Sequence, residues 1–295
     1  MSRLSLVLIS SVAFMYAACG DSDNATSGSQ TASNADMDVR TYSELPSCAE
    51  KRDGKTAYVA DQEQGYICLK GKWVEDDNVK VVDYPSSSSS AVIPGVTGNL
   101  LTDTRDGQTY KTVTIDTQTW MAQNLNYETA NSFCYKDNAS NCTKYGRLYT
   151  WAAAMDSAGK WSTNGKGCGY GLKCSPTGMV RGVCPSGWHM PTETEFETLF
   201  TAVGGESLAG RMLKSISGWN SGGNGTDSFS FSALSAGNKD NYGNYDDEGC
   251  SAHFWSSTEY SSDIAYGMYL IFYDDDPRLD YDLKDYAFSV RCVKD

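Results

Sequence analysis

The chain has 295 residues, of which 40% are hydrophobic, 12% aromatic and only 21% charged, with 28 glycines and 19 tyrosines. This composition excludes a coiled coil or helical bundle, yet it is apolar enough to bury a core in one or two domains. The formal net charge is −13, which repels phosphate backbones, so no nucleic-acid partner is expected. With only two histidines, a multi-histidine metal site is excluded.

The N-terminus has the pattern of an export signal. Residues 4–18 form an apolar run that is shorter than the roughly 20 residues needed to span a bilayer, but it fits the hydrophobic part of a signal peptide. The next residues, Ala-Ala-Cys-Gly, resemble a lipobox, whose cysteine becomes the lipidated N-terminus of a bacterial lipoprotein. An ordinary signal peptide followed by a coincidental cysteine is the alternative. We expect residues 1–18 to be a signal peptide and Cys19 to carry lipid.

A lipidated cysteine implies attachment to a membrane of the cell envelope, and we expect the outer membrane or surface of a Gram-negative bacterium. Ten cysteines in an exported chain predict a disulfide framework.

Composition divides the rest of the chain into four segments. Residues 19–45 hold few sizeable apolar groups and are expected to be a disordered tether, and residues 77–96 contain a serine-rich linker. Residues 46–76 are expected to form a small β module, and residues 97–295 the main domain.

The small module has strand-like stretches on both sides of a turn at Lys70–Lys72. Its only cysteines are Cys48 and Cys68. About 30 residues bury too little surface to be stable alone, so we expect a disulfide between these two cysteines.

Local signals predict four elements in the main domain. Residues 110–120 read as a hairpin with a turn at Asp116, and residues 149–158 as a short helix. Thr192 and Glu195 form a capping-box pattern before a second helix with apolar residues at 196, 199, 200 and 203. Residues 286–293 alternate in polarity and predict a terminal half-buried strand.

Several stretches of the main domain closely resemble, in order, the Fibrobacter succinogenes major paralogous domain family. They are residues 110–127, 145–155, 183–199, 231–237, 254–260 and 288–295. The family is defined by sequence and implies no established biochemical activity.

The order of a Trp-His-Met-Pro-Thr segment, a capped helix, a Phe-Trp-Ser-Ser-Thr-Glu segment and a closing strand is also similar to C-type-lectin-like and formylglycine-generating-enzyme-like domains. This similarity implies an α+β fold with a small twisted antiparallel sheet, two helices, long loops and neighbouring termini. It also implies a long-range disulfide between Cys184 and Cys292.

Proximity in the sequence favours the pairs Cys134–Cys142 and Cys168–Cys174 for the remaining cysteines. Cys250 is then left unpaired.

No enzyme is expected. Cys250, His253 and Glu259 could form a Cys–His site, but their spacing matches no mechanism, and an unpaired cysteine is the simpler explanation. The oxidase-like chemistry of formylglycine-generating enzymes is not carried over, because its cysteine pair is not reproduced.

A ligand-binding surface is the stronger expectation. Residues 240–285 contain twelve acidic and two basic residues, a net charge of −10, interleaved with tyrosines. Tyrosine faces stack on sugars while carboxylates accept hydroxyl hydrogen bonds. The expected ligand-binding residues are Tyr242, Tyr245, Asp246, Asp247, Glu248, Asp274, Asp275, Asp276 and Tyr281.

The alternatives are solvated loop charge, tyrosines buried in the core, and a Ca²⁺ site built from the same acids. No cofactor is expected, apart from Ca²⁺ in this alternative. The favoured ligand is a polysaccharide; the other hypothesis is a structural or protein-interaction module of the cell surface.

Overall fold

The computed structural model describes residues 37–39, 45, 47–48, 53–59, 62, 64–79 and 97–295. The expected signal peptide, Cys19 and most of the tether and linker lie outside these residues.

The small module is a four-stranded sheet in the order β1-β2-β3-β4. Its strands are β1 (Met37–Val39), β2 (Thr56–Val59), β3 (Gln64–Leu69) and β4 (Lys72–Glu75). The turn between β3 and β4 uses Lys70 and Gly71, both with positive φ, and the expected bridge joins Cys48 to Cys68.

Both boundaries of the module differ from the expectation. The expectation that residues 19–45 form no structure is wrong at Met37–Val39, which pairs in parallel with β2. At the other end, Val79 is buried against Tyr58, so the module extends beyond residue 76.

The main domain contains two sheets. The five-stranded sheet has the order β10 (Trp188–His189), β17 (Val293–Lys294), β7 (Gln118–Met121), β6 (Thr109–Ile115), β5 (Thr97–Thr102). The first and last strands of the domain therefore lie in one sheet.

The eight-stranded sheet has the order β15 (Arg278–Leu283), β14 (Ile264–Ile271), β13 (Ser251–Glu259), β11 (Ala236–Lys239), β16 (Ala287–Phe288), β9 (Leu148–Thr150), β8 (Ser132–Phe133), with β12 (Tyr245–Glu248) paired to β11.

Four α-helices occur in the described part of the main domain, whereas two were expected. They are α1 (Ala139–Tyr145), α2 (Trp151–Ala154), α3 (Glu193–Ala202) and α4 (Glu206–Leu213). The α+β class is confirmed.

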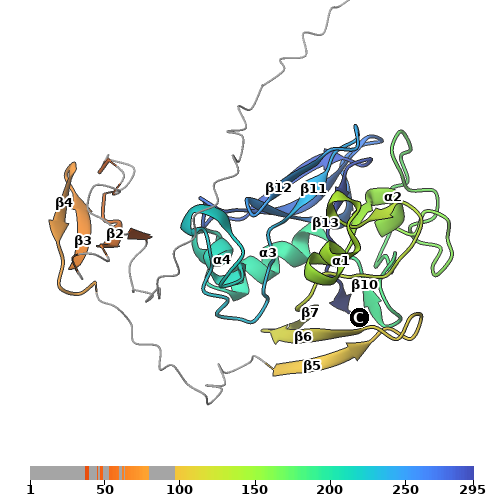
Figure 1. Cartoon of the computed structure of the whole chain (residues 1–295), viewed down its shortest axis with the longest axis horizontal. Coiled ribbons are helices and arrows are strands. Elements are labelled where there is room, and N and C mark those ends of the chain that lie inside the picture. Colours follow the sequence, from red (N-terminus) through yellow and green to blue (C-terminus); the bar gives the residue numbers. More distant parts are fainter. Residues whose placement is uncertain are drawn as a thin grey trace, which may run out of the picture.

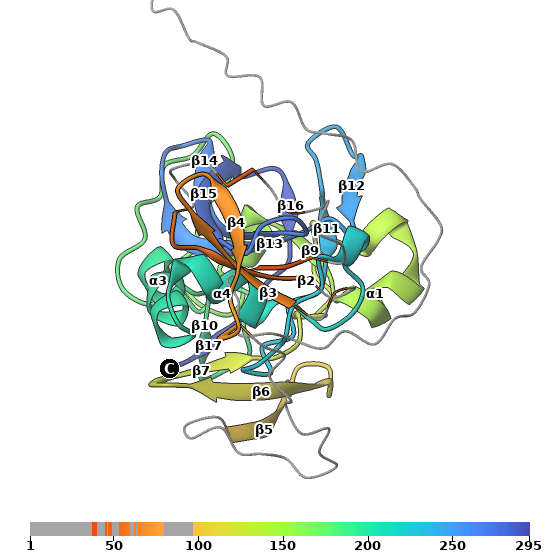
Figure 2. The same ribbon diagram turned by 90° about the vertical axis from the view of Figure 1, so that its left-hand side faces the viewer.

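Helix α3 lies between the two sheets, as both views show (Figures 1 and 2). The expected capping box between Thr192 and Glu195 is present. Phe196, Leu199 and Phe200 are buried in a core shared with both sheets. Burial of this face therefore joins the two sheets.

Two of the other local predictions need correction. Helix α2 is shorter than expected, because Asp156 adopts a positive φ and its carboxylate accepts hydrogen bonds from the backbone of residues 160–162.

The terminal strand is broken, since β16 and β17 belong to different sheets and the chain between them crosses from one sheet to the other. Arg291, one of the residues that alternate with the apolar ones, is fully buried there. The hairpin of β6 and β7, with Asp116 at its turn, forms as expected.

Candidate functional site

An open groove of ≈ 760 Å³ lies where the long loop between α2 and β10 faces the end of β13 and the start of α3. Its lining residues are Lys173, Ser175, Pro176, Thr177, Gly178, Met179, Val180, Thr192, Glu195, Ser257, Thr258, Glu259 and Tyr260. Five of them carry hydroxyls on short side chains, and one end of the groove is aromatic. A surface of this kind suits a polyhydroxylated ligand.

Glu259 fixes the loop side of the groove. Its carboxylate accepts hydrogen bonds from the backbone N–H groups of Cys174 and Ser175 and from Lys284 Nζ, the last at 2.6 Å. Burial alone raises the pKa of Glu259, but the hydrogen bonds from Lys284 and the backbone outweigh it and hold the pKa below its usual value. The carboxylate is therefore ionised and engaged by the protein.

Glu195 is held in a similar way on the helix side. It accepts from Thr192 and from His189 Nε2, whose other ring nitrogen lies 2.9 Å from Asp295 Oδ1. Burial raises the pKa of Glu195, and the hydrogen bonds from His189 and Thr192 lower it below its usual value. Both groove carboxylates thus already have donors, and the hydroxyls of Thr192 and Ser257 already donate to Glu195 and to backbone carbonyls. This leaves the hydroxyls of Ser175, Thr177 and Thr258, Lys173 and the aromatic end for a ligand.

The His189 contacts predict a pH-dependent stability. Burial lowers the pKa of His189, but hydrogen bonds to Glu195 and Asp295 raise it overall. A raised pKa means that this stabilisation is complete below the unfolded pKa of about 6.5 and is lost as the pH rises through the folded pKa. We expect the melting temperature to fall as the pH rises above about 6.5, and we expect His189→Gln to remove that part of the fall. An unchanged pH profile in the variant would contradict this role.

Three tyrosines form the aromatic end. Tyr260 stacks on Tyr281 with ring centroids 4.5 Å apart, and Tyr266 contacts both rings edge-on. Tyr266 and Tyr281 face each other across β14 and β15. Tyr260 is 52% and Tyr281 46% exposed, so the stack presents aromatic surface to solvent beside the groove.

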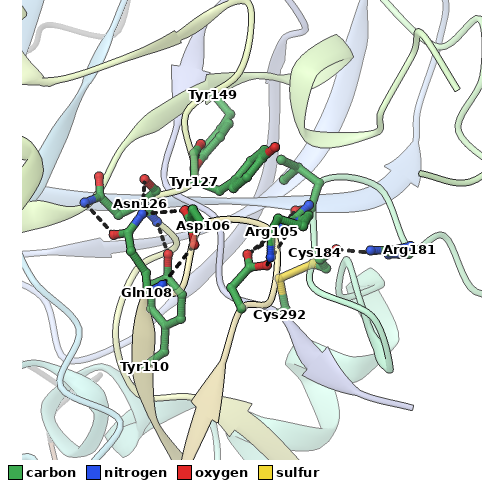
Figure 3. A network of polar contacts seen from close by, with 12 residues as sticks. Arg105, Asp106, Gln108, Tyr110, Asn126, Tyr127, Tyr149, Arg181, Cys184 and Cys292 are labelled. Carbon is green, nitrogen blue, oxygen red and sulfur yellow. Dashed lines mark hydrogen bonds and ion pairs between the residues drawn. A yellow bond between two sulfur atoms is a disulfide. The ribbon is translucent and has the colours of Figure 1, made fainter. Parts of the chain in front are cut away.

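The far end of the loop is anchored by the arginine network of Figure 3. Arg105 pairs with Asp103 at 2.6 Å, donates to the Val183 carbonyl and lies over the Tyr127 ring. Arg181 donates to the carbonyls of Cys184 and Trp161. Both guanidinium groups therefore position the loop backbone.

The nine residues expected to bind ligand occupy three separate neighbourhoods. Tyr242, Tyr245, Asp246, Asp247 and Glu248 lie on β12 and the preceding turn, where Tyr245 and Glu248 hydrogen-bond to Asp137 and Tyr145. Tyr281 alone belongs to the groove's aromatic end.

The acids Asp274, Asp275 and Asp276 lie in the turn between β14 and β15, against α4. The buried Lys214 Nζ donates to the Asp274 carbonyl at 2.9 Å and lies 3.5 Å from Asp275 Oδ1. Gly210 is required beneath this turn, since a Cβ there would lie 2.4 Å from the Asp275 carbonyl oxygen. These contacts give the turn a structural role.

A metal site is not found in the described part of the chain, where no group of three or more His, Cys, Asp or Glu side chains is placed to hold an ion. Within the same residues, no helix has the length and apolarity needed to cross a membrane.

All four expected disulfides are present, including Cys134–Cys142, Cys168–Cys174 and the 108-residue link Cys184–Cys292. The expectation that Cys250 is unpaired is wrong: it is disulfide-bonded.

The Cys–His site considered from the sequence is not formed. His253 Nε2 lies 2.6 Å from Ser251 Oγ, and burial lowers the pKa of His253 to about 3, so the ring is neutral.

The hydroxyl residues of the groove and Lys173 were not among the residues expected to bind ligand. No local sequence pattern marks these residues as a site, because three segments far apart in the sequence supply them. Thr258 shows how they are used: its Oγ1 accepts from the Glu193 N–H at 3.0 Å, so its own proton remains available to a ligand.

Fold and site together define a disulfide-linked α+β domain with an open, hydroxyl-lined groove. The family model described as the Fibrobacter succinogenes major domain matches residues 113–294. Since this match covers more than half of the chain, the protein belongs to that family. Neither a search of curated proteins nor a search of solved structures found a match.

Proposed function

We propose that the protein is a lipid-anchored envelope protein whose main domain, with a C-type-lectin-like fold, binds carbohydrate in the groove. The observation that carries the proposal is the placement of the stacked Tyr260 and Tyr281 at one end of a groove rich in hydroxyls. Aromatic faces pack on the apolar faces of sugars, and hydroxyls both donate and accept hydrogen bonds.

The membrane anchor is proposed from the N-terminal sequence. The lipobox-like residues before Cys19 follow an export signal, and we place the anchor in the outer membrane or surface of a Gram-negative bacterium as part of the same proposal. Mass spectrometry of the N-terminal peptide tests the anchor, and a mature chain without acyl groups would contradict it.

Carbohydrate binding is tested with the detergent-solubilised full chain on a glycan array and by affinity electrophoresis against cell-wall polysaccharides. We expect Tyr260→Ala and Tyr281→Ala each to weaken binding about ten-fold, because each removes half of the stacked pair.

Tyr242→Ala is the matched control. Tyr242 is 85% exposed but lies on the β11–β12 turn, so this variant should bind as the wild type does. Loss of binding in Tyr242→Ala alone would place the site on β12 instead. A flat response to every polysaccharide would favour the protein-interaction role.

A further inference from the structure

The loop that forms one side of the groove differs in charge from the rest of the chain. Residues 157–192 contain four basic residues, Lys160, Lys166, Lys173 and Arg181, and no acidic residue, whereas the whole chain has a net charge of −13. Such a local reversal of sign indicates a surface that meets negative charge.

Two of these four cations are used within the protein. Arg181 donates to the Cys184 carbonyl, as Figure 3 shows, and to the Trp161 carbonyl. Lys160 Nζ lies 4.6 Å from the centre of the Trp161 ring.

Lys166 and Lys173 are exposed, and neither makes an ion pair within the described residues. The Cys168–Cys174 disulfide, with its Cα atoms 5.1 Å apart, brings their neighbourhoods together. Lys173 lines the groove itself, and Lys166 lies two residues before this disulfide on the same loop.

The carboxylates on the other sides of the groove are engaged within the protein. Glu259 is paired with Lys284, and Glu195 shares His189 with Asp295, so one net negative charge stays on the helix side when His189 is protonated. Acidic residues lie around the tyrosines: the exposed Asp280 precedes Tyr281 on β15, and burial, Glu193 and Asp280 all raise the pKa of Tyr266. The groove therefore has a positive loop side and a negative aromatic end.

We propose that the groove selects anionic polysaccharides, whose sugars carry a carboxylate or sulfate, with Lys173 and Lys166 as the residues that recognise the anion. This inference rests on the proposed carbohydrate-binding function. The anionic groups lie along the loop, and an apolar sugar face packs on Tyr260 at the acidic end, which admits no anion.

The test compares polygalacturonate with its fully methyl-esterified form, because the two share one backbone and differ in charge. Dextran sulfate tests recognition of sulfate groups, and a neutral mannan and a neutral xylan are the uncharged polysaccharides for comparison. Affinity electrophoresis of the full chain at about 0.15 M salt gives the dissociation constants; long-range repulsion is then screened beyond about 8 Å.

We expect the anionic form to bind more tightly than the ester. Lys173→Gln should weaken binding of polygalacturonate or dextran sulfate about two- to five-fold, and Lys166→Gln/Lys173→Gln should remove the preference for charge, lowering the ester's affinity less than that of the charged chain. Both lysines are exposed, so the variants should fold. Lys111→Gln, an exposed lysine on β6, is the matched control and should change nothing.

If the charged and esterified chains bound equally well, and Tyr260→Ala still lost the binding of both, the charge preference would be overturned. The proposed carbohydrate binding would remain intact. Dextran sulfate binding that is insensitive to Tyr260→Ala would also overturn the charge preference, since the loop would then act outside the groove. No binding to any polysaccharide would overturn the proposed function itself.

Discussion

Replacing Lys284 with methionine is expected to lower the free energy of unfolding by about 3–5 kcal/mol. The Lys284 side chain is fully buried, and its Nζ donates to Glu259, to the Leu172 carbonyl and to the Ser262 carbonyl. Methionine retains much of the packing against Trp151 but leaves a buried carboxylate without its cation. In a domain of this size we expect the melting temperature to fall by about 10 °C.

Arg278→Gln is the control for this prediction. It removes an ion pair with Asp274 in which the arginine side chain is 46% exposed, so the expected loss is at most about 1 kcal/mol. Lys284→Met/Glu259→Leu should recover only part of the stability. It removes the orphaned charge, but two carbonyls lack their donor and the N–H groups of Cys174 and Ser175 lack their acceptor. A Lys284→Met protein as stable as Arg278→Gln would show that the pair contributes little.

The same pair explains why the groove could not be predicted from the sequence. Lys284 joins Glu259 to the loop at Leu172, so three segments meet through one buried ammonium group. No local pattern marks such a contact. The capping box at Thr192 and the turn at Asp116 were predictable, because each depends on residues within a few positions.

The acidic residues between 240 and 285 were expected to form one binding surface, and here the prediction failed for the opposite reason. They are close in the sequence, but the fold separates them onto β12, the β14–β15 turn and β15. On β15, Asp280 and Asp282 accept hydrogen bonds from the backbone N–H groups of Tyr281 and Leu283. These carboxylates occupy donors on an edge strand and discourage pairing with another chain. Density of charge along the sequence therefore did not indicate one binding face.

The terminal segment was also mispredicted for a physical reason. Alternation of polar and apolar residues predicts one exposed face, but Ser289 and Arg291 are both buried where the chain passes between the sheets. Arg291 donates to Asn124 and to the carbonyls of Phe231 and Ser232, and burial lowers its pKa to about 9. Tertiary hydrogen bonds thus accommodate a charge that the local pattern assigns to solvent.

Removing the Cys184–Cys292 disulfide is the second change expected to have a large effect. This bridge closes a loop of 108 residues and ties β17 to the segment before β10. On the chain-entropy model its loss in Cys184→Ala/Cys292→Ala costs about 4–5 kcal/mol, because the unfolded chain regains the freedom of that loop. Urea denaturation at neutral pH measures the change.

Cys168→Ala/Cys174→Ala is the matched control, since it opens a loop with a sequence separation of only 6. The same model gives a loss of about 2 kcal/mol, so the two variants should differ by about 2.5 kcal/mol. Equal losses would show that loop entropy does not govern these bridges. Because Cys174 also donates its backbone N–H to Glu259, the short-loop variant should weaken polysaccharide binding more than the long-loop variant, measured under conditions where both are folded.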